Sequence, residues 1–270
     1  MLRQLQLNGL KYGAIMVTNL QNQLAYVWDA LSRAFMILFF MLIFVHLWTA
    51  VYQQEGSAEI AGLTLANTIW YFLLAETMEL GRVRHDVQIT AEVKDGSIAY
   101  TLVRPYNYLA YHFFNGFGES VVRMLLVFLL GAPIAIYYAG APTLDWRHLP
   151  AVLLIIILAG VLDFFFTSMI GLLAFLTEET FSFRLIYSKI TFILGGLLIP
   201  LDFLPAWLQP VARALPFNLM TYAPAKLFVA FDVAQFWQMI RLHLIWLPLL
   251  GLLLTAQFRW ATRRLAVNGG

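Results

Sequence analysis

The stretch AVLLIIILAGVL, residues Ala151–Leu162, decides the class of fold. Its apolar residues follow one another without the alternation of polar and apolar side chains that is typical of a membrane β-strand. It lies within a longer apolar block, Leu149–Leu176, and roughly twenty helical residues are enough to cross a hydrocarbon core about 30 Å thick. A helix also satisfies its own backbone hydrogen bonds in lipid. The stretch therefore predicts a transmembrane helix rather than a barrel strand.

Similar apolar blocks recur along the whole chain. Of its 270 residues, 61% are hydrophobic and only 12% are charged, far from the balance of an ordinary soluble domain. Six blocks have about the length of a membrane span: Leu31–Val51, Ile60–Leu80, Tyr108–Tyr138, Leu149–Leu176, Leu185–Leu201 and Leu242–Phe258. The short connections leave little room for a soluble domain. Residues 1–270 are therefore expected to form a single all-α, polytopic membrane domain with six transmembrane helices.

About thirty residues precede the first block. They contain several Gln and Asn residues where a cleavable signal peptide would have an apolar run, so the first span itself is expected to direct insertion. Leu20, Leu24, Val27 and Leu31 recur at helical spacing. This pattern fits an N-terminal amphipathic helix on the membrane surface and equally fits an extension of the first span.

The positions of basic residues predict the orientation. Most of the 17 Lys and Arg residues lie near the chain ends and in the loops after the second and fourth blocks. The positive-inside rule therefore places both termini in the cytoplasm. A net charge of +2 is too small to favour nucleic acid as a partner, and the basic residues lie at membrane edges, beside lipids.

The loop after the second block contains a polar segment of helical character, EVKDGSIAYTLVRPY (Glu92–Tyr106). Val87 and Ile89 give the preceding residues an apolar side, Gly96 can end a first short helix, and the apolar pattern resumes at Ile98. We expect two short helices along the inner membrane surface. The alternative is an ordinary solvated loop, although a loop that only connects spans can be far shorter.

A second irregular region precedes the sixth span, with the sequence GGLLIPLDFLPAWLQPVARALPFNLMTYAPAKLF (residues 195–228). Five of the ten prolines in the chain fall here, which argues against a continuous spanning helix. Apolar residues between the prolines keep helical spacing. The region therefore predicts two short, re-entrant amphipathic helices in the outer leaflet.

The motif DGSIAYTLVRPYNY (Asp95–Tyr108) resembles the signature "G, hydrophobic, two or three residues, L, x, R, P" of a bacterial subgroup of largely uncharacterised efflux permeases. The layout of the whole chain is similar to the membrane subunit of type-2 ABC exporters. The resemblance implies a dimer with a second permease subunit, either the same chain or a related one. It also implies two copies of a separate ABC ATPase, which would bind ATP and Mg.

Under this resemblance, the segment before and around Gly96 is a coupling helix that docks on the ATPase. The residues before Gly96 are expected to make the contact, and Arg104 with Pro105 to turn the chain into the third span. The inner loop Thr177–Arg184 would be a second contact. The predicted coupling residues are Val87, Ile89, Glu92, Val93, Lys94, Asp95, Gly96, Ile98, Arg104, Glu178 and Glu179.

Charges within the blocks are a second set of candidates. Glu119 and Arg123 are four residues apart, so on a helix they face the same way and can neutralise each other. They belong either to a substrate path or subunit contact, or to a paired anchor at the inner edge, which we favour. Asp163 has no partner at close spacing and is either a functional carboxylate or hydrogen-bonded to a neighbouring helix. Small residues such as Gly118 and Gly171 are expected to allow close helix packing.

Motifs of catalysis are absent from the sequence. It has no G-x-x-x-x-G-K-[ST], H-E-x-x-H or G-x-S-x-G, so we expect no enzyme and no cofactor in this chain. The expected function is the permease subunit of an ATP-driven exporter in the bacterial inner membrane. Scarce charge in the blocks suggests an amphiphilic or hydrophobic cargo. The alternatives are a secondary transporter or channel, in which inverted repeats and midplane helix breaks are more usual, and a non-transporting membrane scaffold.

Overall fold

The computed structural model describes residues 2–142, 144–177 and 179–268, without the side chains of residues 2–8, 33 and 264–268. The described chain is all-α apart from one short hairpin, β1 (Glu59–Ile60) and β2 (Leu63–Thr64). The longer helices are α1 (Leu2–Ala25), α3 (Met36–Glu55), α4 (Leu65–Leu80), α7 (Tyr108–Ala139), α8 (Leu149–Leu172), α9 (Phe181–Leu194) and α12 (Val233–Asn268). The shorter ones are α2 (Val27–Ala34), α5 (His85–Lys94), α6 (Ile98–Leu102), α10 (Gln209–Ala214) and α11 (Tyr222–Val229), with 3-10 turns η1 (Trp146–His148), η2 (Leu173–Phe175), η3 (Leu201–Phe203) and η4 (Pro216–Leu219).

Four helical stretches of the described chain are long and apolar enough to cross a membrane: Val27–Glu55, Tyr108–Ala139, Trp146–Phe175 and Val233–Arg263. The two other apolar blocks form shorter helices, α4 with 16 residues and α9 with 14. The hairpin occupies the start of the first of these blocks. A left-handed Gly196 (φ +77°) and Pro200 follow α9. The all-α class predicted from the sequence is confirmed, and the count of six spans stays a prediction.

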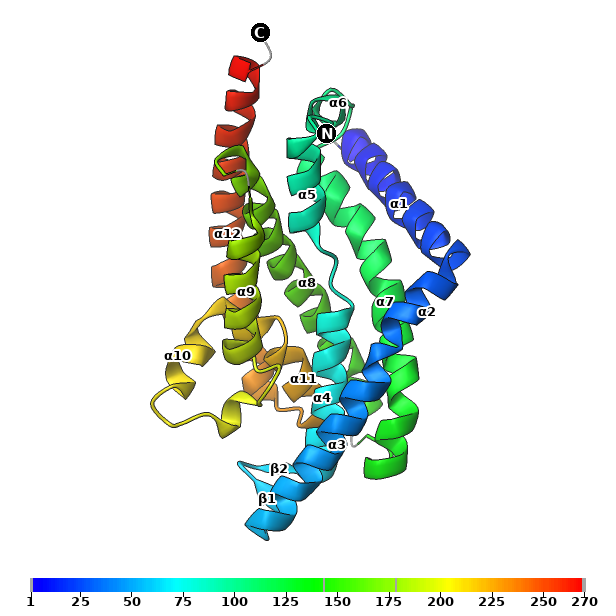
Figure 1. Ribbon diagram of the computed structural model, residues 1–270, viewed down its shortest axis with the longest axis vertical. Coiled ribbons are helices and arrows are strands. Elements are labelled where there is room, and N and C mark those ends of the chain that lie inside the picture. Colours follow the sequence, from blue (N-terminus) through cyan, green and yellow to red (C-terminus); the bar gives the residue numbers. More distant parts are fainter. Residues whose placement is uncertain (1, 143, 178, 269–270) are drawn as a thin grey trace.

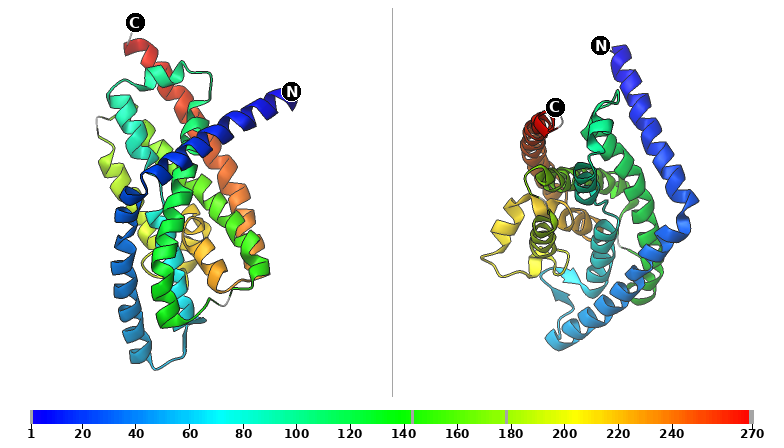
Figure 2. Two further views of the ribbon diagram at one scale, coloured as in Figure 1. Left: turned by 90° about the vertical axis from the view of Figure 1, so that its right-hand side faces the viewer. Right: turned by 45° about the horizontal axis from the view of Figure 1, so that its top comes forward.

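The helices run between the two ends of an elongated bundle (Figures 1 and 2). Helices α5 and α6 lie at the same end as the N- and C-terminal parts of the chain, and the β1–β2 hairpin lies at the opposite end. Successive segments α3, α4, α7, α8, α9 and α12 run in alternating directions between these ends. The polar segment and the termini therefore share one end, as the distribution of basic residues predicts.

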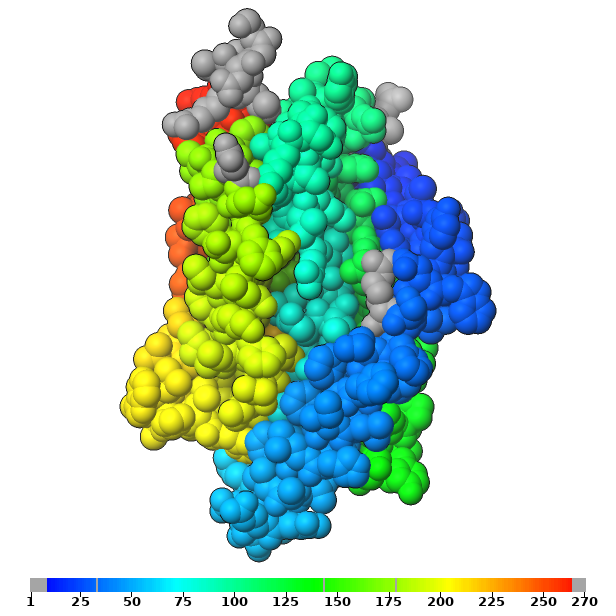
Figure 3. Space-filling model, in the orientation of Figure 1, coloured from blue at the N-terminus to red at the C-terminus, as the bar shows by residue number. Residues whose placement is uncertain are grey.

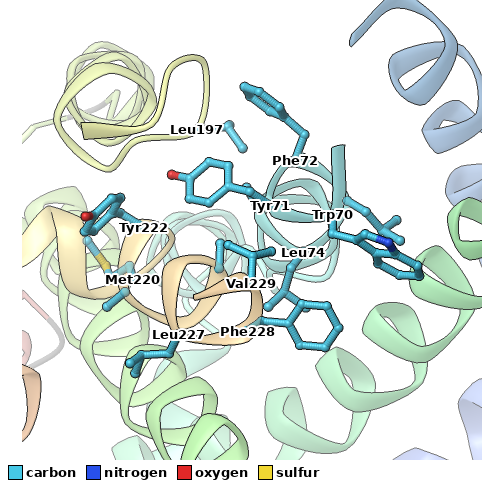
Figure 4. Close-up of a cluster of buried hydrophobic side chains, with 14 of the residues drawn as sticks. Trp70, Tyr71, Phe72, Leu74, Leu197, Met220, Tyr222, Leu227, Phe228 and Val229 are labelled. Atoms are coloured by element: carbon cyan, nitrogen blue, oxygen red, sulfur yellow. The ribbon is translucent and has the colours of Figure 1, made fainter. Parts of the chain in front are cut away.

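Helix α4 is the centre of the bundle, packed against α3, α7 and α11. Residues 68–78 are all buried, so every side of this part of the helix faces other parts of the protein. The ring of Phe72 stacks on Phe44 with 4.5 Å between centroids, and the Tyr71 hydroxyl donates a hydrogen bond to the Gly196 carbonyl at 2.6 Å. Figure 4 shows aromatic and aliphatic side chains of α4 meeting those of α11.

The proline-rich region before α12 is compact. Asp202 accepts hydrogen bonds from Lys226 Nζ at 2.8 Å and the Tyr222 hydroxyl at 3.0 Å, and it pairs with Arg213 at 2.9 Å. These contacts hold η3, α10 and α11 together. Every residue of α11 is buried in the protein, so this helix differs from the predicted amphipathic helix in the leaflet. Its apolar spacing serves packing against α4 and α8 instead.

The N-terminal residues form a separate helix, because the chain bends at Tyr26 between α1 and α2. Helix α1 lies along α7 (Figure 2). A Cβ atom at Gly118 of α7 would lie 2.7 Å from the Met16 carbonyl oxygen, so glycine is needed for this close approach. The Asn19 amide also donates to Asn115 Oδ1 at 3.0 Å. The location of α1 on the membrane surface stays a prediction.

Candidate functional site

The polar segment between α4 and α7 forms the two short helices α5 and α6, joined by a tight turn at the end of the bundle opposite the β1–β2 hairpin, which the sequence predicts to be the inner end. Gly96 has φ +76°, a left-handed conformation that glycine adopts without strain. The Asp95 carboxylate accepts a hydrogen bond from the Ser97 amide at 2.8 Å, which closes the turn. Hydrogen bonds to the Ser97 side chain and amide lower the pKa of Asp95. The break therefore lies at Gly96, where the sequence places it.

One side of this segment is packed into the bundle. Ile89 of α5 and Ile98 of α6 are completely buried, in a cluster that includes Phe164 and Leu172 of α8, and Val93 packs against it. A Cβ at Gly171 of α8 would lie 2.8 Å from Ile89 Cβ, so α5 rests directly on the α8 backbone. Ile89 and Ile98 are thus internal supports of the segment and present no surface to a partner.

Glu92 also faces the protein. Its carboxylate accepts a hydrogen bond from the Tyr108 hydroxyl at 2.8 Å, and its other oxygen lies 3.3 Å from His112 Nε2. Burial raises the pKa of Glu92, but the contacts with His112 and Tyr108 outweigh it and hold the pKa below its usual value. Burial, together with the nearby His112, lowers the pKa of His85 to about 3. Glu92 therefore ties α5 to the start of α7.

The two predicted inner contacts touch each other. Lys94 Nζ pairs with Glu179 Oε1 at 2.5 Å, and the hydroxyls of Thr90 and Thr180 are 2.9 Å apart. The structure thus brings the end of α5 together with the loop between α8 and α9. Glu178 lies outside the described residues.

The exposed side of the segment carries different residues. Tyr100 and Val103 are 78% and 87% exposed, and Lys94, Asp95 and Arg104, which are exposed as well, lie close to them along the chain. We call these five residues the inner docking face. Tyr100 and Val103 were not among the residues predicted from the sequence, because α6 has a single turn and shows no periodicity that would assign its exposed side.

The chain then turns into α7. The Asn107 side chain accepts a hydrogen bond from the Ala110 amide at 2.9 Å and so caps this helix. The Asn107 amide donates to the Tyr12 hydroxyl at 3.0 Å, and Lys11 Nζ donates to the Pro105 carbonyl at 3.0 Å. Helix α1 is therefore attached at the point where the inner segment ends. Val87, another predicted coupling residue, is 41% exposed but lines a cleft on the side of the bundle.

Charged residues meet in that cleft. Glu119 and Arg123 form an ion pair, as their spacing predicts. Asp163 accepts a hydrogen bond from the Tyr187 hydroxyl at 2.7 Å and lies 3.4 Å from Arg82 Nε. Asp163 is thus hydrogen-bonded to Tyr187 of the neighbouring helix α9 and paired with Arg82, which follows α4. Arg82 is mostly buried and also pairs with Glu79 at 3.0 Å.

Within the described ranges, no set of three or more His, Asp or Glu side chains is arranged to hold a metal ion. The candidate sites among the described residues are the inner docking face and the charged cleft on the side of the bundle, which we call the lateral cleft.

The long apolar helices are those of a multi-pass membrane protein. The model of the family described as "ABC-2 family transporter protein" matches residues 30–269, and the chain belongs to this family. It is a membrane permease of an ABC transporter, a family that in general works with an ABC ATPase and is not itself catalytic. The resemblance to type-2 ABC permeases is thereby confirmed. Neither the curated proteins nor the solved structures contain a match to the chain.

Proposed function

We propose that this permease is the membrane-spanning subunit of an ATP-driven exporter in the bacterial cytoplasmic membrane. It acts as a single domain, residues 1–270, paired with a second permease subunit of the same or a related chain. Two copies of the ABC ATPase bind ATP and Mg below the membrane. The observation that carries the proposal is the inner docking face, an apolar and charged surface on a segment fixed firmly to the bundle.

Six crossings with both termini in the cytoplasm fit this assignment. Helix α4 has only 16 residues, but the chain before it lies at the hairpin end and the chain after it at the inner end. Helix α9 likewise connects the inner loop at Thr180 to the proline-rich region. Helices surrounded by protein need less length than helices that face lipid along their whole course, because neighbouring segments cover their ends. The basic residues favour the cytoplasm for the inner end.

Docking is assigned to the exposed residues. Tyr100 and Val103 would enter an apolar groove of the ATPase, while Lys94, Asp95 and Arg104 would make polar contacts at its rim. Ile89, Val93, Ile98 and Glu92 act from behind by fixing the segment to the bundle. This modifies the expectation from the sequence, which favoured the residues before Gly96.

Closure of the ATPases would then move α5 and α6 as one body. Contacts at Gly171, Glu92 and Thr180 would transmit this movement to α8, α7 and α9 respectively. The movement would open a path for cargo on the outer side. Membership of an ABC transporter family argues against the secondary transporter, channel and scaffold alternatives.

Co-purification with the ATPase tests the proposal. The double variant Tyr100→Ala/Val103→Ala removes the apolar centre of the inner docking face. A single interface anchor of this kind contributes roughly 2 kcal/mol or more, which is about 30-fold in affinity, and such contributions are not additive, so the double variant should bind at least about 30-fold more weakly. The matched control is Tyr137→Ala/Val233→Ala, at side chains that are 81% and 59% exposed and lie elsewhere on the molecule.

The control variant should bind the ATPase like the unmodified chain. Joint reversal of the charges at Lys94 and Asp95, which are exposed, gives a second comparison. If only that reversal abolishes binding, while the Tyr100 and Val103 changes leave it intact, docking lies before Gly96 and the inner docking face is misassigned. If neither change affects the complex or its ATPase activity, the segment is not the coupling element.

A further inference from the structure

A lateral cleft of about 740 Å³ lies between α2, α5 and α9, with α7 and α8 behind it. Figure 3 shows this face of the molecule, with α9 on one side and α5 and α2 on the other. Ligand sites usually have volumes of roughly 300–1,000 Å³, so the cleft is large enough for a lipid headgroup or a small amphiphile.

The polar lining of the cleft contains both signs of charge in equal number. The acidic residues are Glu79, Asp86, Glu119 and Asp163, and the basic ones are Arg82, Arg84, Arg123 and Arg184. Several are already paired across helices, including Arg82 with Asp163 at 3.4 Å and Arg184 with Asp86 at 3.5 Å. These residues come from separate parts of the sequence, so their clustering was not predicted. The small number of charged residues in the apolar blocks therefore no longer supports a conclusion about the polarity of the cargo.

The remaining lining is apolar. Ala30 and Ala34 of α2, Leu80 of α4 and Leu185 of α9 border the charged groups. Phe181 and Leu185 are also about half exposed on the outer surface of α9. A ligand in the cleft thus contacts charged residues in one part and apolar residues in another. This arrangement matches the polar headgroup and the apolar tail of an amphiphile.

Charge balance limits the headgroup. An uncompensated charge in a site of low polarity is costly, because the surroundings replace little of its hydration. A headgroup with one net charge would leave the balanced lining with an excess of that sign. A headgroup that carries both signs can form a pair with each kind of residue and leave the total unchanged.

Asp86 specifies the cation. Its side chain is only 3% exposed, and Oδ2 makes no hydrogen bond with any described residue, although Arg184 lies 3.5 Å away. A buried carboxylate oxygen normally accepts a hydrogen bond. Because Oδ2 is shielded from solvent beside Arg184, the donor must take the place of Arg184; an ammonium with N–H groups can do so, whereas a quaternary ammonium cannot donate.

We propose that the cleft binds the headgroup of an amphiphile that combines a primary ammonium with a phosphate or carboxylate. The inference rests on the proposed transport function and names its substrate class. Asp86 accepts a hydrogen bond from the ammonium, and Arg184 pairs with the acidic group. Asp86 belongs to α5, so a bound headgroup contacts the same helix that connects to the inner docking face.

Binding to the purified permease without ATPase tests this inference. The probes are three fluorescent lipids with identical short acyl chains and different headgroups: phosphatidylethanolamine, phosphatidylcholine and phosphatidylglycerol. A hydrogen bond to a charged group contributes about 1.5–3 kcal/mol, so phosphatidylethanolamine should bind at least about tenfold more tightly than phosphatidylcholine. Phosphatidylglycerol, with its net negative charge, should bind more weakly than phosphatidylethanolamine.

The variant Asp86→Asn keeps the size of the side chain and removes its charge. It should lose most of the preference for phosphatidylethanolamine over phosphatidylcholine, while the control Glu55→Gln, at an exposed carboxylate at the end of α3, should keep it. Three outcomes overturn the inference: equal binding of all three lipids, preference for phosphatidylglycerol, or an unchanged preference in Asp86→Asn. The lipid-binding assay contains no ATPase, so its result does not depend on whether the inner docking face binds the ATPase. Failure of the lipid preference and failure of ATPase docking can therefore be told apart.

Discussion

Substitution of Gly171 by alanine tests whether close contact of α5 with α8 is needed for coupling. The added Cβ would lie 2.8 Å from Ile89 Cβ and 3.1 Å from the Asp86 carbonyl oxygen, well inside the 3.5–4.0 Å at which carbon atoms pack. Overpacking of this kind costs about 1–3 kcal/mol. If this cost falls on the packing of α5 against α8, the ratio of packed to displaced α5 falls by about 5- to 150-fold.

The same helix contains a matched control. A Cβ at Gly160 of α8 would meet no atom within 4 Å, so Gly160→Ala changes only helix propensity, by about 1 kcal/mol in favour of the helix. The difference in the free energy of unfolding between the two variants therefore isolates the steric cost at Gly171.

Two measurements follow from this comparison. In detergent, Gly171→Ala should melt lower than Gly160→Ala by roughly 2–4 °C for each kcal/mol. In the reconstituted complex, stimulation of the ATPase by cargo should fall in Gly171→Ala and persist in Gly160→Ala. Equal melting temperatures and equal stimulation in the two variants would refute the argument that α5 is seated on α8 through this glycine.

Three further predictions concern other parts of the bundle. In the unfolded chain His85 binds a proton below about pH 6.5, whereas in the folded chain it does so only near pH 3. The free energy of unfolding should therefore fall as the pH drops from 6.5, by up to about 1.4 kcal/mol per pH unit. In melting curves measured at several pH values, His85→Gln should flatten this dependence. Lys226→Met should lower the melting temperature, because it leaves the buried charge of Asp202 with one cation fewer; Lys226→Met/Asp202→Asn should recover part of the loss. Gly118→Ala should separate α1 from α7 and speed proteolysis within α1, whereas Gly13→Ala, which meets nothing within 4 Å, should not.

The fold class was predictable because long apolar runs have few structural solutions in lipid. The burial of α4 at the centre of the bundle could not be predicted from the sequence. Apolar side chains that face protein and those that face lipid are chemically alike, so the sequence of residues 68–78 does not reveal that this helix is surrounded by protein. For the same reason α11 was expected at the lipid surface.

The candidate sites show a similar division. The break at Gly96 was readable, since a glycine between two short helical patterns has few other uses. The outward direction of Tyr100 was not, because α6 has a single turn and gives no periodicity. Asp163 of α8 pairs with Arg82, which lies in the connection between α4 and α5, so the distance between them along the chain hid the pairing from any local pattern.

The central position of α4 also bears on how the protein is made. Helix α3 precedes it in the chain, but two other helices that enclose it, α7 and α11, follow it, the last ending only at Val229. During synthesis α4 is therefore made before two of the helices that enclose it. Until these have been inserted, the polar side chains of Glu76 and Thr77 lack the protein surroundings that bury them in the folded protein. Ribosome-bound chains that stop before α11 should expose α4 to the quality-control proteases of the membrane.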